Sequence, residues 1–289
     1  MSPKIYDRLF EGLVRGLALV AVLLLVFIVF FIAKESYPVF KQVDLSTFLL
    51  GQDWRPLSDP PRLSILPMLA ATIAVSLGAL FIALPVGLGC GLFLSQVCPP
   101  QWRRIIRPFL DIMAGIPSVV YGFLGVMLLI PLVEKYFDVS SGESLLCGSI
   151  LLAIMILPFI ISTCDETMSK AAAKYLPASK SLGVSRWYMF RHLLLPASKI
   201  GIISGAILGT ARAMGETMAV MMVVGNAALM PTSIFERIKP IPALIALEMG
   251  SAPLGSLHYH ALFAAGLVLM LLLVTINLIF YLIRQRLEV

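Results

Sequence analysis

Two charged residues lie within an otherwise apolar stretch of this 289-residue chain. Arg212 and Glu216 stand four residues apart in GIISGAILGTARAMGETMAVMMVVGN, and Thr217 follows them. A guanidinium near the centre of a membrane costs at least ~2.5 kcal/mol, so its presence needs a reason. If the segment is one helix, Glu216 shares a face with Arg212 and can pair with it. Two interpretations stay open: a structural ion pair, or an arginine that meets an anion and is restrained by Glu216.

A second functional candidate is the basic segment PASKSLGVSRWYMFRHLLLP, residues 177–196. Gly183 tolerates a positive φ and is a natural turn position. Ser185 can cap a second short helix, which Pro196 ends. Two short helices that meet at a glycine outside the bilayer form a protrusion that implies a partner with a matching cleft. The alternative interpretation is an ordinary basic loop. The candidate contact residues are Ala178, Ser179, Gly183, Ser185, Arg186 and Pro196.

The composition identifies the kind of protein that positions these residues. Hydrophobic residues make up 59% of the chain and charged residues 13%, which is typical of an integral membrane protein. Polar and apolar residues do not alternate over barrel-length segments, so the spans are predicted to be helices. The expected fold class is therefore all-α, with six transmembrane helices.

Long apolar runs place the six spans along the chain, and glycines four residues apart, at 87 and 91 and at 201, 205 and 209, predict faces for close helix packing. The spans are expected at 16–33, within 63–102, at 109–133, at 145–164, from about 200 to 226, and at 259–283. Residues 1–15 resemble an interfacial helix, 34–66 an external loop without a core of its own, 102–107 a short basic loop, and 241–249 a short helix dipping toward the pathway. The domain prediction is a first unit at 1–60, made of the amphipathic segment, the first transmembrane helix and the external loop, and a transmembrane domain at 61–289.

The distribution of lysine and arginine predicts the orientation. With both termini inside, the inner segments hold 14 basic residues and the outer segments 7. The net charge of +6 therefore reflects topology and contact with anionic lipid, and nucleic-acid binding is not expected.

Other residues that could do chemistry are assigned to structure. The sequence contains no GxxxxGK[ST] phosphate-binding loop, so ATP must be hydrolysed by another subunit, and neither enzymatic activity nor a cofactor is predicted. His258 and His260 lack further metal ligands nearby in the sequence, so no metal site is expected. Asp165 and Glu166 are interpreted as solvated acids at the inner end of the fourth span.

Several of these segments resemble a known family. The segment 177–196 resembles the coupling loop of ABC importer permeases, which docks into a cleft of the ATPase subunit; Pro177 stands where that family usually has Glu. AGIPSVVYGFLG (114–125), RAMGETMAVMMVVGN (212–226) and LEMGSAPLGSLHYHALFAAGLVLML (247–271) together resemble the phosphate ABC importer permeases. The form GETMAV…GN is nearer the PstC-type subunit than its PstA-type partner, and the resemblance covers roughly residues 60–285.

The resemblance implies one membrane half of an ATP-driven phosphate importer in the cell inner membrane. Arg212 and Glu216 match residues that the family uses in phosphate passage, and Thr217 follows the same match. The implied partners are a PstA-type permease, a PstB-type ATPase dimer and a PstS-type external phosphate-binding protein. Three alternatives stay open: a permease for another oxyanion (sulfate or molybdate), a secondary transporter or channel driven by an ion gradient, and a non-transporting scaffold.

Overall fold

The structure is a computed structural model that describes the backbone of residues 3–288 and the side chains of residues 10–286. Its helices are α1 (Pro3–Phe40), α2 (Leu45–Leu50), α3 (Leu66–Leu92), α4 (Pro100–Gly115), α5 (Ser118–Leu124), α6 (Ile130–Phe137), α7 (Leu145–Ser181), α8 (Arg186–Met189), α9 (Leu195–Gly215), α10 (Met218–Val223), α11 (Ile241–Glu248) and α12 (Leu257–Glu288). The strands β1 (Trp54–Arg55) and β2 (Arg62–Leu63) form an antiparallel hairpin. Three wide π-helical turns are η1 (Phe93–Val97), η2 (Gly125–Leu129) and η3 (Phe190–Leu194).

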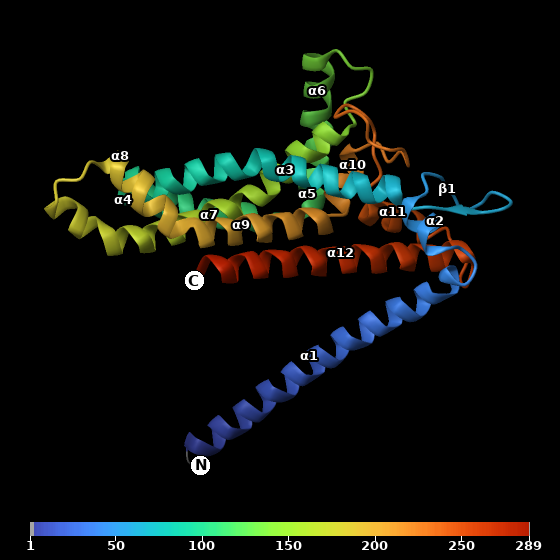
Figure 1. The fold of residues 1–289 in the computed structure, drawn as a ribbon, viewed down its shortest axis with the longest axis horizontal. Coiled ribbons are helices and arrows are strands. Elements are labelled where there is room, and N and C mark those ends of the chain that lie inside the picture. The colour runs from blue at the N-terminus through green and yellow to red at the C-terminus, as the bar shows by residue number, and fades with distance from the viewer. Residues whose placement is uncertain (1–2, 289) are drawn as a thin grey trace.

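Six of the described segments are long and apolar enough to cross a membrane, which confirms the predicted number of spans. They are Phe10–Phe40, Leu66–Val97, Ser118–Phe137, Leu145–Ser181, Arg186–Gly215 and Leu257–Arg286. Figure 1 shows α3, α7, α9 and α12 lying along one direction, whereas α1 diverges from α12 toward the N-terminus. The predicted interfacial helix is the first part of α1, and the side chains of residues 1–9 on which that prediction rested lie outside the described ones.

Helix α7 is the centre of the bundle, because α3 and α9 both pack closely against it. A Cβ on Gly87 of α3 would lie 2.6 Å from Ile160 Cγ2. Gly205 and Gly209 of α9 approach Thr163 and Ile160 in the same way. The small-residue faces predicted from the sequence are therefore confirmed as helix contacts.

Each π-helical turn immediately precedes a proline. The bonds that close the turns run from Cys98 N to Phe93 O, from Ile130 N to Gly125 O, and from Leu195 N to Phe190 O, and residues 99, 131 and 196 are prolines. A proline donates no N–H and its ring clashes with the carbonyl four residues earlier, so a wider turn relieves the conflict. The prediction that Pro196 ends a short helix was wrong, because η3 carries the helix through Pro196 into α9.

Two span boundaries also differ from the prediction. The expected loop at 102–107 is part of helix α4, and the third span begins at Ser118. The predicted end of the fourth span near residue 164 is not a helix end, because α7 continues without interruption to Ser181. Hydropathy locates the apolar part of a helix, and these helices extend beyond it.

Segment 34–66, predicted to be an external loop without a core of its own, contributes to a core that it shares with later helices. Val39, Phe48 and Ile65 are fully buried in a cluster with residues of α11 and α12. Helix α2 and the β-hairpin supply part of this cluster, and α11 confirms the short helix expected at 241–249.

His258 and His260, at the start of α12, both take part in polar contacts. The Glu248 carboxylate accepts bonds of 2.9 Å from Trp54 Nε1 and Lys239 Nζ, and His258 Nε2 lies 2.9 Å from it. Burial raises the pKa of Glu248, but these hydrogen bonds outweigh it and the pKa lies below its ordinary value. His260 Nδ1 lies 2.8 Å from the carbonyl oxygen of Glu35. Through these contacts, His258 and His260 connect α12 to residues 34–66.

Candidate translocation site and coupling loop

The fifth span is broken at the candidate site. Helix α9 ends at Gly215, Glu216 is extended (φ −72°, ψ 130°), and α10 starts at Met218. The expectation of one continuous helix from about residue 200 to 226 was therefore wrong. Glycine is a weak helix former, and irregular backbone at membrane depth is tolerated where it lines a cavity or packs in protein.

Arg212 lies on the last turn of α9 and is exposed in this chain. Its guanidinium carbon is 4.4 Å from the centre of the Phe159 ring of α7, a cation–π contact. Among the described residues, no ion pair joins Arg212 to Glu216, so the ion pair that was one of the two open interpretations does not form in this chain. The break after Gly215 removes the helical geometry on which that pairing depended.

The Glu216 carboxylate is instead directed at the backbone that follows. Its Oε1 accepts bonds from Thr217 N at 3.3 Å and Ala219 N at 3.4 Å, so it caps the start of α10. Thr217 Oγ1 donates to the Gly215 carbonyl at 3.4 Å. The predicted residues Arg212, Glu216 and Thr217 all lie at this break. Arg212 is exposed, and Glu216 stabilises the start of α10.

A second break lies in the segment GIPS. Helix α4 ends at Gly115 and α5 starts at Ser118. Tyr121 Oη donates a 2.9 Å hydrogen bond to the Met113 carbonyl, which satisfies an acceptor at the end of α4. Helix α5 packs on α10, where a Cβ on Gly122 would lie 3.1 Å from Ala219 Cα. Both discontinuous helices therefore meet beside the candidate site.

The turn of the coupling loop is fully hydrogen-bonded. Gly183 has φ +67°. Its N–H donates to Lys180 O at 3.2 Å, and Val184 N donates to Ser179 O at 3.0 Å, the pattern of a Schellman motif. Ser185 caps α8 by accepting a bond from Tyr188 N at 3.2 Å, as predicted. The helix before Gly183 is not short, however, because it is the end of α7.

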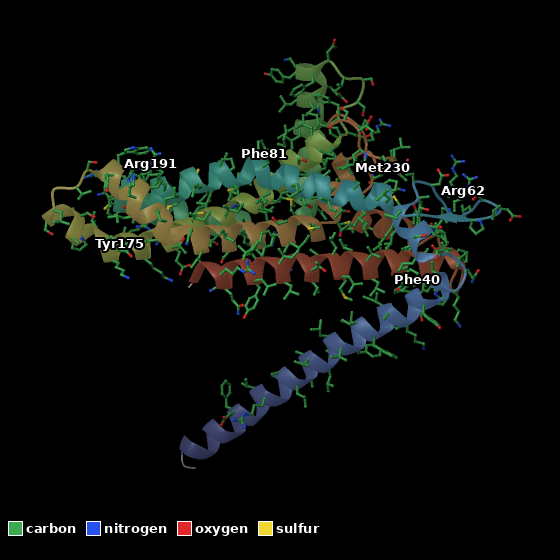
Figure 2. The ribbon with its side chains drawn as sticks, in the orientation of Figure 1. Phe40, Arg62, Phe81, Tyr175, Arg191 and Met230 are labelled. Carbon is green, nitrogen blue, oxygen red and sulfur yellow. The ribbon has the colours of Figure 1, made fainter. Side chains whose placement is uncertain are left out.

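The loop has its own apolar core and an exposed apolar tip. Met189 and Leu194 are buried against α7. Leu182 and Trp187 are 79% and 67% exposed. Neither was predicted as a contact residue from the sequence, although apolar side chains within a basic loop are the signal that could have identified them. Figure 2 shows Arg191 at this end of the molecule. Of the predicted contact residues, Ser179 is buried and the others are exposed; these are Ala178, Gly183, Ser185, Arg186 and Pro196.

Asp165 was predicted to be solvated, and this was wrong. Its side chain is 4% exposed and forms ion pairs with Arg103 Nη2 at 2.6 Å and with Arg107 Nη2 at 2.7 Å. Ser169 also bonds to it. The neighbouring Glu166 is exposed and pairs with Lys170 at 2.6 Å, as a solvated acid does. The buried pairs fasten α4 to α7.

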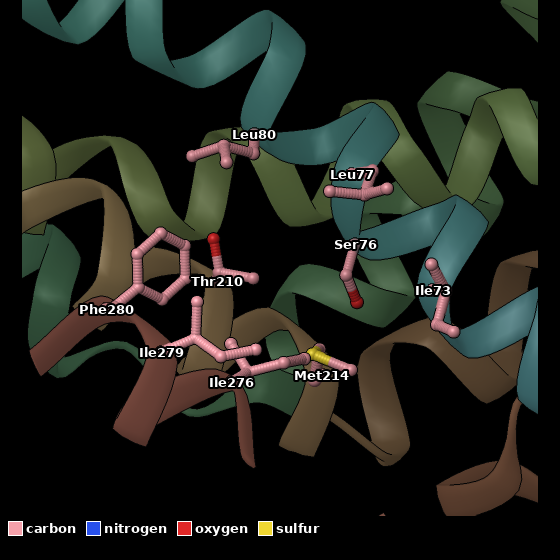
Figure 3. Close-up of a pocket in the computed structure, with 9 residues that line it drawn as sticks. All are labelled: Ile73, Ser76, Leu77, Leu80, Thr210, Met214, Ile276, Ile279 and Phe280. Carbon is pink, nitrogen blue, oxygen red and sulfur yellow. The ribbon is translucent and has the colours of Figure 1, made fainter. Parts of the chain in front are cut away.

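An apolar cavity of about 260 Å³ lies between α3, α9 and α12 (Figure 3). Nine residues line it: Ile73, Ser76, Leu77, Leu80, Thr210, Met214, Ile276, Ile279 and Phe280. None of them is charged, and the Ser76 hydroxyl has no hydrogen-bond partner there. The cavity therefore offers no positive charge to an anion, and the candidate site is the exposed face that carries Arg212.

Known proteins resemble this chain in sequence and in fold. The chain is 35% identical over 240 residues to the probable ABC transporter permease protein YqgH of Bacillus subtilis, covering 83% of this chain and 78% of that one. It is 31% identical over 307 residues to the phosphate transport system permease protein PstC of Pasteurella multocida, covering 100% and 94%. The permease of the inward-facing MetNI methionine ABC transporter superposes with a TM-score of 0.59 at 16% identity, covering 75% of this chain and 93% of that chain.

A family description matches most of the chain. Residues 83–289 match the family described as binding-protein-dependent transport system inner membrane component. Members are multi-pass inner-membrane permeases of ABC transporters, which work with a separate ATPase subunit and a substrate-binding protein. The match and the relatives agree with the six spans and with the resemblance seen in the sequence. The chain belongs to the binding-protein-dependent transport system inner membrane component family.

Proposed function

We propose that this chain is one membrane half of an ATP-driven phosphate importer. The observation that carries the proposal is Arg212, an exposed guanidinium at a helix break in the membrane, which stacks on Phe159 and is not neutralised by Glu216. A multiply charged anion that leaves water needs compensating charge, and the planar fork of arginine matches the oxygens of phosphate. Relatives whose names give phosphate as their substrate support the anion's identity.

The partners and the orientation belong to the same proposal. A second permease of the PstA type would close the pathway, a PstB-type ATPase dimer would receive the coupling loop, and a PstS-type protein would deliver phosphate from outside. Both termini and the Gly183 turn lie in the cytoplasm, because the basic residues gather on that side. In this arrangement residues 61–289 form the permease domain, and residues 1–60 form a unit with the first transmembrane helix and an external loop.

The contact residues at the coupling end follow from the geometry. Leu182 and Trp187 supply exposed apolar surface, and Arg186 supplies exposed charge beside them. Exposed aromatic and arginine side chains are common anchors of protein interfaces. The ATPase would bind this exposed tip of the coupling loop, and α7 would transmit the movement of the ATPase into the membrane.

The test is transport by the reconstituted four-component complex. With ATP inside the vesicles, we expect uptake of radiolabelled phosphate that an ionophore does not abolish and that excess sulfate or molybdate does not compete away. Competition by either anion would identify a different oxyanion as substrate. Uptake without ATP that an ionophore stops would indicate a secondary transporter.

A further inference from the structure

A groove of about 570 Å³ opens between the coupling-loop halves of α7 and α9 and the end of α12. Lys170 and Lys174 of α7 line it together with Arg284 of α12. The single acid in its lining is Glu166. Among the described residues that line it, cations therefore outnumber acids, and the groove favours an anion.

The groove begins one helical turn along α7 from the residue that Arg212 contacts. Phe159, on which Arg212 stacks, is followed on the same face of α7 by Thr163, Lys170 and Lys174, at spacings of four, eleven and fifteen residues. Thr163 already lines the groove. At 1.5 Å per residue, Lys170 lies about 16 Å and Lys174 about 22 Å along the helix from Phe159. One continuous face thus joins the membrane site to the coupling end.

The hydroxyl groups along this face are already engaged. Thr163 donates to Phe159 O at 2.8 Å, Thr167 to Thr163 O at 2.7 Å, and Ser204 to Ile200 O at 2.8 Å. With their protons in these bonds, they present lone pairs, which do not attract an anion. An anion that moves from Arg212 toward the coupling end meets its next donors at the lysines.

We propose that this groove is the exit site of the transported anion, with Lys170 and Lys174 receiving it after Arg212. The inference rests on the proposed function and adds the route on the cytoplasmic side. Glu166, 2.6 Å from Lys170 Nζ, competes with the anion for that ammonium group, so the anion is attracted but not held. The ligand is a free phosphate-like oxyanion, and a phospholipid headgroup is the outcome that the experiment separates from it.

The experiment compares the double variant Lys170→Gln with Lys174→Gln against the wild-type complex. We expect the maximal rate of phosphate uptake to fall about fivefold to tenfold, the size of effect expected for a lost charge contact. The phosphate concentration for half-maximal uptake, the amount of assembled complex and the basal ATPase activity should stay unchanged. Replacing both lysines by arginine should keep uptake near the wild-type rate. Lys199→Gln is the matched control, because Lys199 is exposed at the same end of the bundle and does not line the groove.

Each other outcome overturns the inference in a distinct way. Wild-type uptake in the double variant removes the exit role, whereas absence of phosphate uptake in the wild-type complex defeats the proposed function itself. A parallel fall in basal ATPase activity would show that the lysines act in docking. A loss of uptake confined to vesicles that contain phosphatidylglycerol, and absent from phosphatidylcholine vesicles, would show that the groove binds lipid.

Discussion

The chain turns at the Gly183 loop and again at the Gly215–Thr217 break, and the two turns are built differently. At Gly183 two backbone hydrogen bonds of 3.0 and 3.2 Å close the turn, and an apolar cluster packs beneath it. At the break, the start of α10 is held by two longer bonds to one flexible carboxylate, that of Glu216. A Cβ on Gly215, like one on Gly183, would meet no atom within 4 Å, so the two turns differ in their hydrogen bonds and not in the space around the glycine.

This difference suggests a division of work between the two regions. The coupling end is continuous with α7 and is fastened to α4 through Asp165, so it is suited to move as one body. The side-chain bonds at the break are 3.3–3.4 Å long and therefore weaker than the backbone bonds of the Gly183 turn, and regions of low local stability are the ones that move in conformational changes. We therefore expect the coupling end to transmit motion and the break to respond to it.

The largest effect on stability is expected for Asp165→Asn, which would disconnect the coupling end from α4. Removing one partner of a fully buried ion pair costs about 3–5 kcal/mol, and the cost here is smaller because the side chains of Arg103 and Arg107 are 25% and 48% exposed. The thermal unfolding temperature of the purified complex would fall by several degrees and transport would be lost. The matched control is Glu166→Gln, which removes a neighbouring but exposed carboxylate. Equal unfolding temperatures for the two variants would contradict the fastening role.

A smaller effect is expected for Gly183→Val, which changes the angle of the turn. A β-branched residue at φ +67° costs about 1–3 kcal/mol, although no atom would clash with its Cβ. The complex should still assemble, but stimulation of its ATPase activity by substrate-loaded binding protein should be lost. Gly183→Asn is the control, since asparagine tolerates a left-handed conformation. Wild-type stimulation and uptake in Gly183→Val would show that the turn is not the contact with the ATPase.

The smallest effect is expected at the break, for Glu216→Ala. Loss of a helix cap costs about 0.5–2 kcal/mol, and the break has little other support. Glu216→Gln keeps an acceptor oxygen and should unfold at a temperature closer to that of the wild type. If glutamine destabilised the complex as much as alanine, the charge of Glu216 would matter more than its capping bonds, which would favour an ion pair with Arg212.

Local features were predictable from the sequence where neighbouring residues determine them. The positive φ of Gly183 and the cap at Ser185 follow from residue type and from the next few residues. The glycine repeat of α9 likewise identified the face that packs on α7. The division of the chain near residue 60 stays a prediction.

Features that depend on distant residues could not be predicted. Asp165 follows an apolar run, and its partner Arg103 lies 62 positions away, so the sequence alone suggested a solvated acid. The pairing of Arg212 with Glu216 assumed a continuous helix, and the glycine between them breaks it. The core of the external segment forms with α11 and α12, about 200 residues later in the chain, and hydropathy does not show such contacts.

The most direct test of the account is phosphate uptake by three variants of the membrane site, measured together with the amount of assembled complex. Arg212→Gln should abolish uptake while assembly and basal ATPase activity persist, because only the stabilisation of the anion is lost. Arg212→Lys should retain part of the uptake, since it keeps the charge without the bidentate geometry. The double variant Arg212→Gln with Glu216→Gln should stay inactive. Recovery of both assembly and uptake in the double variant would show that Arg212 serves as a structural partner of Glu216, and would contradict its role as the anion contact.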